Sequence, residues 1–182
     1  MIWLAIGLFS RFSMSALGLQ FAPPGSAALD TVGVIFMLVP AAVLSSCLPS
    51  QAPSLEAVRA RNVLVPQLLW SAWILLVSCS APLFALSVLH PSVDSRSFYA
   101  TWLLVVGAVL ALALVLSTVM ASLTAFFVLA VFTTPNVISW QHNLVYNVGI
   151  SGTSALVGAA LAVTALLLHG VKNSSIGLSS TG

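Results

Sequence analysis

Charge is what this sequence has least of. Its 182 residues include five lysines and arginines and three acidic residues, so charged side chains make up 4% of the chain. Soluble domains carry about 25% charged residues, and a water-soluble fold cannot cover its surface with so few. Hydrophobic residues make up 60%, and the mean hydropathy is +1.14. The composition therefore excludes a soluble domain and predicts an integral membrane protein, while a net charge of +2 is too small to indicate a nucleic acid partner.

Lysine and cysteine are scarce as well. The one lysine is Lys172, near the C-terminus, and the chain contains no G-x-x-x-x-G-K-[ST] sequence. The chain therefore cannot supply the lysine of a P-loop, and any ATP hydrolysis must take place on another polypeptide. The two cysteines, Cys47 and Cys79, lie in apolar stretches. This setting favours small packing residues over a disulfide or a zinc site.

Catalytic and cofactor-binding patterns are weak. The acidic residues Asp30, Glu56 and Asp94 fall near the ends of apolar runs, whereas a proton-coupled carrier usually keeps a carboxylate at the membrane midplane. This pattern does not exclude a carrier driven by sodium. A haem site needs two histidines on facing helices at one depth, and His90 and His142 both sit at loop edges. An interfacial histidine or a metal on the outer side is more ordinary, no G-x-S-x-G serine is present, and we expect no cofactor on this chain.

Long uncharged runs make up most of what remains. A membrane helix needs about 20 apolar residues, and the 37 residues from 98 to 134 are too many for one span, so they predict a hairpin that bends near 116–124. No basic residue precedes the first apolar run and Arg11 interrupts it, so we expect no cleavable signal peptide. The prediction is an all-α integral membrane protein, one transmembrane domain over 1–182, with about six transmembrane helices at roughly 1–21, 29–48, 63–89, 98–116, 119–134 and 149–169.

The basic residues suggest an orientation. Arg59 and Arg61 lie between the second and third predicted spans, and six spans put Lys172 on the same side. Arg96 lies on the other side, offset by Asp94. Because basic residues favour cytoplasmic loops, we expect both termini in the cytoplasm and a multi-pass protein of the plasma membrane.

The one gathering of charge is "PSLEAVRARNV", residues 53–63, which we expect to form a short cytoplasmic helix between the second and third spans. Pro53 suits the first helical turn, and Glu56 there is favoured by the helix dipole and can pair with Arg59. Two interpretations stand: a solvated connector, or a coupling helix that docks into a cytoplasmic partner. The candidate partner-binding residues are Leu55, Glu56, Val58, Arg59, Arg61 and Asn62.

A second polar stretch, "TTPNVISWQHNLVYN", precedes the last span. Its aromatic residues are typical of an interfacial belt, which gives the simpler interpretation. Alternatively, a pair of short helices dips into the outer leaflet and gates an exit path, with amides satisfying backbone groups at that depth. The candidate gate or substrate-path residues are Asn136, Trp140, Gln141, His142, Asn143, Tyr146 and Asn147.

Small residues recur along the last predicted span, where they let helices approach closely. They predict either packing inside one bundle or a dimer face. The residues concerned are Ser151, Ser154, Ala155, Gly158 and Ala159.

The order of these parts resembles ABC transporter permeases of the type 2 exporter class, and small permease-like proteins encoded beside ABC ATPases in high-GC Gram-positive bacteria. Such permeases have six spans, a coupling helix between the second and third, and a polar extracellular segment before the sixth. The "PSLEAVRARNV" and "TTPNVISWQHNLVYN" stretches match these two positions. One departure is that such permeases usually begin with an amphipathic cytoplasmic helix, whereas this chain starts almost directly in an apolar run, part of which can lie in the interface.

The resemblance implies a permease subunit that exports an apolar or amphipathic peptide, lipid or drug. Its partners would be a cytoplasmic P-loop ATPase subunit, which holds ATP and magnesium, and a second permease, either the same chain or a sister chain, within membrane lipid. The alternative is an accessory or anchor subunit of a larger membrane complex that transports nothing itself. A membrane enzyme or haem protein is a third and weaker possibility.

Overall fold

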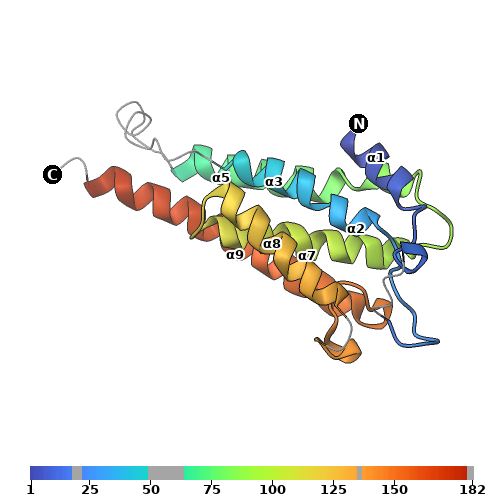
Figure 1. The fold of residues 1–182 in the computed structure, drawn as a ribbon. Coiled ribbons are helices and arrows are strands. Elements are labelled where there is room, and N and C mark those ends of the chain that lie inside the picture. Colours follow the sequence, from blue (N-terminus) through green and yellow to red (C-terminus); the bar gives the residue numbers. More distant parts are fainter. Residues whose placement is uncertain (18–21, 49–63, 135–136, 180–182) are drawn as a thin grey trace.

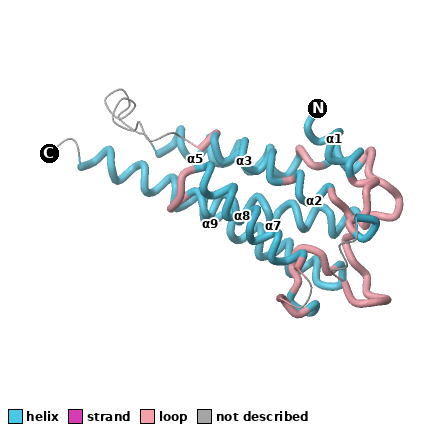
Figure 2. Tube along the Cα trace, in the orientation of Figure 1, coloured by secondary structure: helices cyan, strands magenta, loops and turns pink. Residues whose placement is uncertain are grey.

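The structure, a computed structural model, describes residues 1–17, 22–48, 64–134 and 137–179. These residues form helices joined by turns, and within these ranges there is no strand (Figure 2). In order, the elements are α1 (Ile2–Phe9), η1 (Ser15–Leu17), α2 (Gly33–Phe36), α3 (Leu38–Ser46), α5 (Leu64–Ser80), α6 (Leu83–Leu86), α7 (Ser95–Ala113), α8 (Thr118–Thr133), η2 (Trp140–His142), η3 (Val148–Ile150) and α9 (Ser151–Ser179).

Three helical stretches are long and apolar enough to cross a membrane: Leu69–Leu86, Ser95–Ala113 and Val148–His169. Two further apolar helices, Gly33–Ser46 and Thr118–Thr133, are shorter. Large apolar side chains are exposed along these helices, among them Trp73 on α5, Phe127 on α8 and Leu156 on α9. The described residues thus form a helical protein with three candidate spans, and the six spans expected from the sequence are not confirmed.

The span predicted over 1–21 is wrong for the residues described. α1 has eight residues, which gives a length of about 12 Å against a hydrocarbon core of about 30 Å. It ends at Phe9: the Arg11 and Phe12 N–H groups bond three residues back, and the Ser10 hydroxyl donates to the Gly7 carbonyl at 2.5 Å where the chain turns. α1 instead packs beside α6, so closely that a β-carbon on Gly7 would lie 3.0 Å from the Ala85 carbonyl oxygen.

The second predicted span, 29–48, also begins later and is interrupted. Helix starts at Gly33, because the backbone before it bonds to other segments, and α2 gives way to α3 at Met37. Pro40 lies in the first turn of α3. A regular helix would need a hydrogen bond from the nitrogen of residue 40 to the Phe36 carbonyl, and proline has no N–H to make it. The two pieces together remain a 14-residue apolar helix.

The uncharged run from 98 to 134 divides into two helices, as its length led us to expect. α7 ends at Ala113 and α8 begins at Thr118. Each start has a side-chain cap: Asp94 accepts a hydrogen bond from the backbone N–H of Ser97 at 2.8 Å, and Ser117 accepts one from Met120 at 3.4 Å. Such caps satisfy N–H groups that have no partner inside the helix.

α7 is the centre of the molecule, and its most extensive contact is with α9. The two helices meet at glycines: a β-carbon on Gly107 would lie 2.3 Å from the Gly158 carbonyl oxygen, and one on Gly158 would lie 2.4 Å from the Leu103 carbonyl carbon. The backbones therefore touch, which only residues without a side chain allow. Phe98 and Trp102, both fully buried, fill the other faces of α7.

The helices run along one long axis, and their ends separate into two groups (Figure 1). At one end, called here the coil end, lie the end of α3, the start of α5, the α7–α8 turn and the last turns of α9. At the other, called the loop end, lie the segments 10–17, 22–32, 87–94 and 137–150, whose turns gather together (Figure 2). α9 continues to Ser179, beyond the span predicted to end near residue 169.

Candidate functional site

The predicted partner-binding residues, 55, 56, 58, 59, 61 and 62, lie outside the part of the chain that the structure describes. The helices on either side of this charged segment are described: α3 ends at Ser46 and α5 begins at Leu64, both at the coil end. α9 also finishes there (Figure 1). The site that can be built from atomic contacts is the loop end, where most of the predicted gate residues lie.

The segment 137–150 is held against the rest of the chain by its backbone. The Leu29 N–H donates to the Tyr146 carbonyl at 2.7 Å, and the Val148 N–H donates to the Ala27 carbonyl at 3.3 Å, so Ala28 and Asn147 form an antiparallel bridge. From α7, the Thr101 hydroxyl donates to the Val145 carbonyl at 2.8 Å. The segment is therefore tied to two parts of the chain far from it in sequence.

Two asparagines shape this segment from within. The Asn143 amide donates to the Phe132 carbonyl at the end of α8 at 3.0 Å, and its oxygen accepts from the Tyr146 N–H at 3.1 Å. The Asn147 amide donates to the Trp140 carbonyl at 2.9 Å, and its oxygen accepts from the Gly149 N–H at 2.9 Å. Both amides thus bond to the backbone of their own chain and hold the loop in one conformation.

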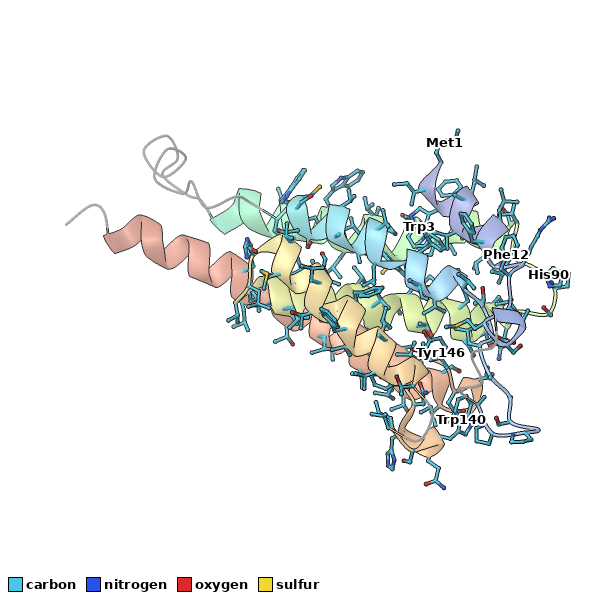
Figure 3. The ribbon with its side chains drawn as sticks, viewed as in Figure 1. Met1, Trp3, Phe12, His90, Trp140 and Tyr146 are labelled. Atoms are coloured by element: carbon cyan, nitrogen blue, oxygen red, sulfur yellow. The ribbon has the colours of Figure 1, made fainter. Side chains whose placement is uncertain are left out.

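The predicted gate residues differ in exposure. Asn143 and Tyr146 are buried, and Figure 3 shows the position of Tyr146 at the loop end. Burial raises the pKa of the Tyr146 phenol above its ordinary value. Gln141 and His142 are exposed, and the His142 Nδ1 lies 2.7 Å from the Ser139 hydroxyl oxygen. Trp140 is half-buried, and Asn136 lies outside the described residues.

A second polar cluster at the loop end was not predicted from the sequence. The Ser15 N–H donates to a carboxylate oxygen of Asp30 at 3.0 Å, and the Ser15 hydroxyl donates to the other. Burial raises the pKa of Asp30, but the hydrogen bonds from Ser15, the Ser13 hydroxyl and the Met14 N–H together lower it by more, so the pKa lies below its ordinary value. The only signal in the sequence is the alternation of Ser13 and Ser15 with apolar residues, which does not identify Asp30 as the partner.

A third segment joins the same end. The His90 N–H donates to the Ser10 hydroxyl oxygen at 3.2 Å, and the Thr31 hydroxyl donates to the Ser10 carbonyl at 3.2 Å. The His90 ring reaches outward at the tip of the molecule, with Nδ1 2.6 Å from the Ser92 hydroxyl (Figure 3). Ser10, where α1 stops, is thus the residue that links the turn after α6 to the turn before α2.

The small residues of α9 contact its neighbours inside the bundle. Gly158 is buried against α7, and the buried Ser154 hydroxyl donates to the Leu144 carbonyl at 2.6 Å and to the Ile150 carbonyl at 3.2 Å. Ser151, Ala155 and Ala159 are half-buried. Gly158 therefore packs α9 on α7, and Ser154 fixes the segment 137–150 to the start of α9.

The loops of the loop end are held in place by hydrogen bonds, because their polar groups mainly bond to one another and to the backbone. Among the described residues, no group of three or more histidine, cysteine or acidic side chains could hold a metal ion. Cys47 and Cys79 are both free and exposed. What this arrangement can do is cover the helix ends and hold them in register. No protein family, curated protein or solved structure gave a significant match to the chain.

Proposed function

We propose that this chain is a transmembrane subunit of an ATP-driven exporter-like complex in the plasma membrane. In this proposal the charged segment 53–62 docks into a cytoplasmic P-loop ATPase, and a second permease chain completes the path. The substrate is an apolar or amphipathic molecule such as a peptide, lipid or drug. ATP and magnesium are held by the partner, and the C-terminus of this chain is cytoplasmic. The N-terminus lies only the short helix α1 away from the loop end, so the expectation that it is cytoplasmic as well is not kept in this proposal.

The observation that supports the proposal is the separation of the two ends. The helices that flank the charged segment, α3 and α5, have their flanking ends at the coil end together with the last turns of α9. The polar segment 137–150 belongs to the opposite end, where it covers the ends of α7 and α8. A permease needs this division, because one end must meet the ATPase and the other must release substrate.

The substrate path in this proposal runs along the surface of the chain, where it meets a second permease. The interior supports this choice, since Trp102, Phe98 and Val106 are fully buried around α7 and the α7 and α9 backbones touch at Gly107. A path through a single copy would need these contacts to separate. ATP-driven closure would then move whole copies against one another.

The proposal is tested by purification in mild detergent and by charge substitutions. We expect a P-loop ATPase to copurify, with its turnover stimulated by this chain. Glu56→Lys and Arg59→Glu should each weaken assembly or stimulation, because charges at the rim of an interface steer docking. Arg59→Gln is the matched control, since it removes the charge without adding an opposite one. Wild-type assembly and turnover in both charge-reversal variants, at equal expression, would remove the coupling role.

Orientation is tested separately in intact cells. After Cys47 and Cys79 are replaced by serine, Ser95→Cys should react with an impermeant thiol reagent. Ser54→Cys and Asn173→Cys should not react until the membrane is permeabilised. Labelling of Ser54→Cys from outside would reverse the orientation and end the exporter proposal.

One observation favours a second function, that of an anchor subunit in a larger membrane complex. The polar groups of the loop end bond within the chain, for example Asn143 to the Phe132 carbonyl and Asn147 to the Trp140 carbonyl, which suits a rigid lid. A copurifying complex that lacks any P-loop ATPase would favour this function over the exporter.

A further inference from the structure

The two short apolar helices lie on the same side of the bundle. The helix over Gly33–Ser46 has 14 residues and α8 has 16, which correspond to about 21 and 24 Å. α3 and α8 contact each other, and each also contacts α7. We call the surface formed by residues 33–46 and 118–133 the short flank.

The apolar helical stretches on the opposite side of the molecule are longer. The apolar stretch Val148–His169 of η3 and α9 has 22 residues, about 33 Å, and the Leu69–Leu86 stretch, which is divided between α5 and α6 by the break at Pro82, has 18 residues and is at most about 27 Å long. The α9 stretch exceeds the hydrocarbon thickness of about 30 Å, whereas both helices of the short flank fall below it by about 6 to 9 Å. The difference between the two sides is therefore built into the bundle.

Polar residues fix the length of α8 at both ends. Ser117 caps its start, and at its end the Thr133 and Thr134 hydroxyls both donate to the Ala130 carbonyl, at 2.7 and 3.0 Å. Beyond Thr134, the buried Asn143 holds the last turn through the Phe132 carbonyl. At the C-terminal end of α8, a longer apolar helix would break these bonds, whereas at its start the cap at Ser117 separates α8 from the apolar turn residues Leu114, Val115 and Leu116.

The side chains of α8 indicate what covers its outer face. Helices that associate closely in a bilayer use small residues at the contact. The small residues Ala121 and Ala125 of α8 are already buried inside the bundle. Its outer face is bulky and exposed, which suits fluid acyl chains better than a second helix; it consists of Val119, Met120, Leu123, Phe126, Phe127, Val128 and Val131.

We propose that the short flank is surrounded by a locally thinned bilayer and binds phospholipids with short acyl chains in preference to those with long chains. Bilayers adapt to a short apolar surface by thinning, at a modest cost per Å of mismatch. Short-chain lipids meet that surface at lower cost, so they gather beside α3 and α8 and not beside α9. The inference rests on the proposed membrane location and goes beyond the proposed transport.

Two leucines allow a matched test. Leu123 on α8 and Leu161 on α9 are 48% and 36% exposed, and each lies about 4 Å from the middle of its apolar stretch, toward the coil end. In a chain with Cys47→Ser and Cys79→Ser, each leucine is changed to cysteine and labelled with a fluorophore. The full chain is reconstituted in dioleoylphosphatidylcholine vesicles that contain dibrominated phosphatidylcholine with chains of either 14 or 22 carbons.

We expect the 14-carbon lipid to quench the Leu123→Cys label about threefold more effectively than the 22-carbon lipid, with no such preference at Leu161→Cys. Thr133→Leu combined with Thr134→Leu lengthens the apolar part of α8 and should reduce the preference. Equal preferences at the two sites would overturn the inference. Cross-linking between copies through Leu123→Cys at high lipid-to-protein ratio would overturn it too, because a second copy then covers the flank. A chain that fails to float with the vesicles would instead refute the membrane location on which both proposals rest.

Discussion

Trp102 offers the sharpest test of how the bundle is held together. Pro82 ends the helical ladder of α5, because it has no N–H to donate to the Ser78 carbonyl four residues before it. The Trp102 indole N–H, from α7, donates to that carbonyl at 2.7 Å. The Tyr99 hydroxyl donates to the next carbonyl, Cys79, at 2.9 Å. Two aromatic side chains of α7 therefore take the place of the backbone donors that α5 lacks at its break.

Trp102→Phe removes the donor and leaves the Ser78 carbonyl in apolar surroundings. A buried acceptor that loses its partner costs about 1 to 3 kcal/mol. Hydrogen bonds between helices in membrane proteins contribute less, about 0.6 to 1.7 kcal/mol, because the unfolded chain also finds partners. The smaller ring also loses part of its contact with Trp3, whose ring centroid lies 4.5 Å away. We expect a loss of about 2 kcal/mol in the free energy of unfolding.

The assay is unfolding in dodecyl maltoside micelles by added sodium dodecyl sulfate, followed by circular dichroism. Trp73→Phe is the matched control, since Trp73 is 56% exposed and should lose less than about 0.5 kcal/mol. A second substitution separates the hydrogen bond from packing: Pro82→Ala supplies a backbone N–H that can reach the Ser78 carbonyl. The double variant should recover about half of the loss, as a coupling energy between the two sites.

Two results would refute this reasoning. If Trp102→Phe loses no more stability than Trp73→Phe, the indole N–H contributes nothing measurable. If Pro82→Ala fails to recover any stability in the Trp102→Phe background, the loss comes from packing around the smaller ring. In either case the account of Pro82 as the cause of the Trp102 hydrogen bond is wrong.

Three of the contacts give further predictions. Gly158→Ala should destabilise the protein by at least about 1 to 3 kcal/mol, because its β-carbon overlaps the α7 backbone; Gly152→Ala, with nothing within 4 Å of the added carbon, should be neutral or better in the same unfolding assay. Asn143→Leu should cost about 1 to 3 kcal/mol by leaving its α8 carbonyl partner unbonded, and it should speed hydrogen exchange in 137–150 as measured by mass spectrometry. Hydrogen bonds from Ser97 lower the pKa of Asp94, so its contribution is complete above the unfolded pKa of about 4 and is lost as pH falls through the lower folded pKa. Asp94→Ala should therefore give a shallower loss of stability between pH 5 and pH 2 than the wild type, and an identical pH profile would contradict the cap.

The sequence predicted helices best where length and capping residues act locally. The uncharged run 98–134 had to divide, and Ser117, which caps α8, lies inside the stretch where the bend was expected. The run 1–21 misled, because its hydropathy does not reveal that α1 lies beside α6 and stops at Ser10. Contacts of that kind join residues far apart in the chain, and the spacing of apolar residues along the sequence does not predict them.

The candidate site shows the same limit. The amides of Asn143 and Asn147 were recognised as the polar content of 137–150, but their partners were not. An asparagine that lines a path and one that bonds to a carbonyl of its own chain look alike in sequence. The Asp30 and Ser15 pair was missed for the same reason, since its members are 15 positions apart and belong to different turns.

The glycine contact between α7 and α9 can form only late in synthesis of the chain. Gly158 lies 51 positions after Gly107, and ribosomes add about 5 to 20 residues per second, so α7 is made roughly 3 to 10 seconds before its main partner exists. During this interval α7 can pack only against α8 and the earlier helices, and its contact surface for α9 is not covered. A nascent chain arrested before Gly158 should therefore be degraded quickly or remain with the insertion machinery, and release should coincide with the emergence of α9.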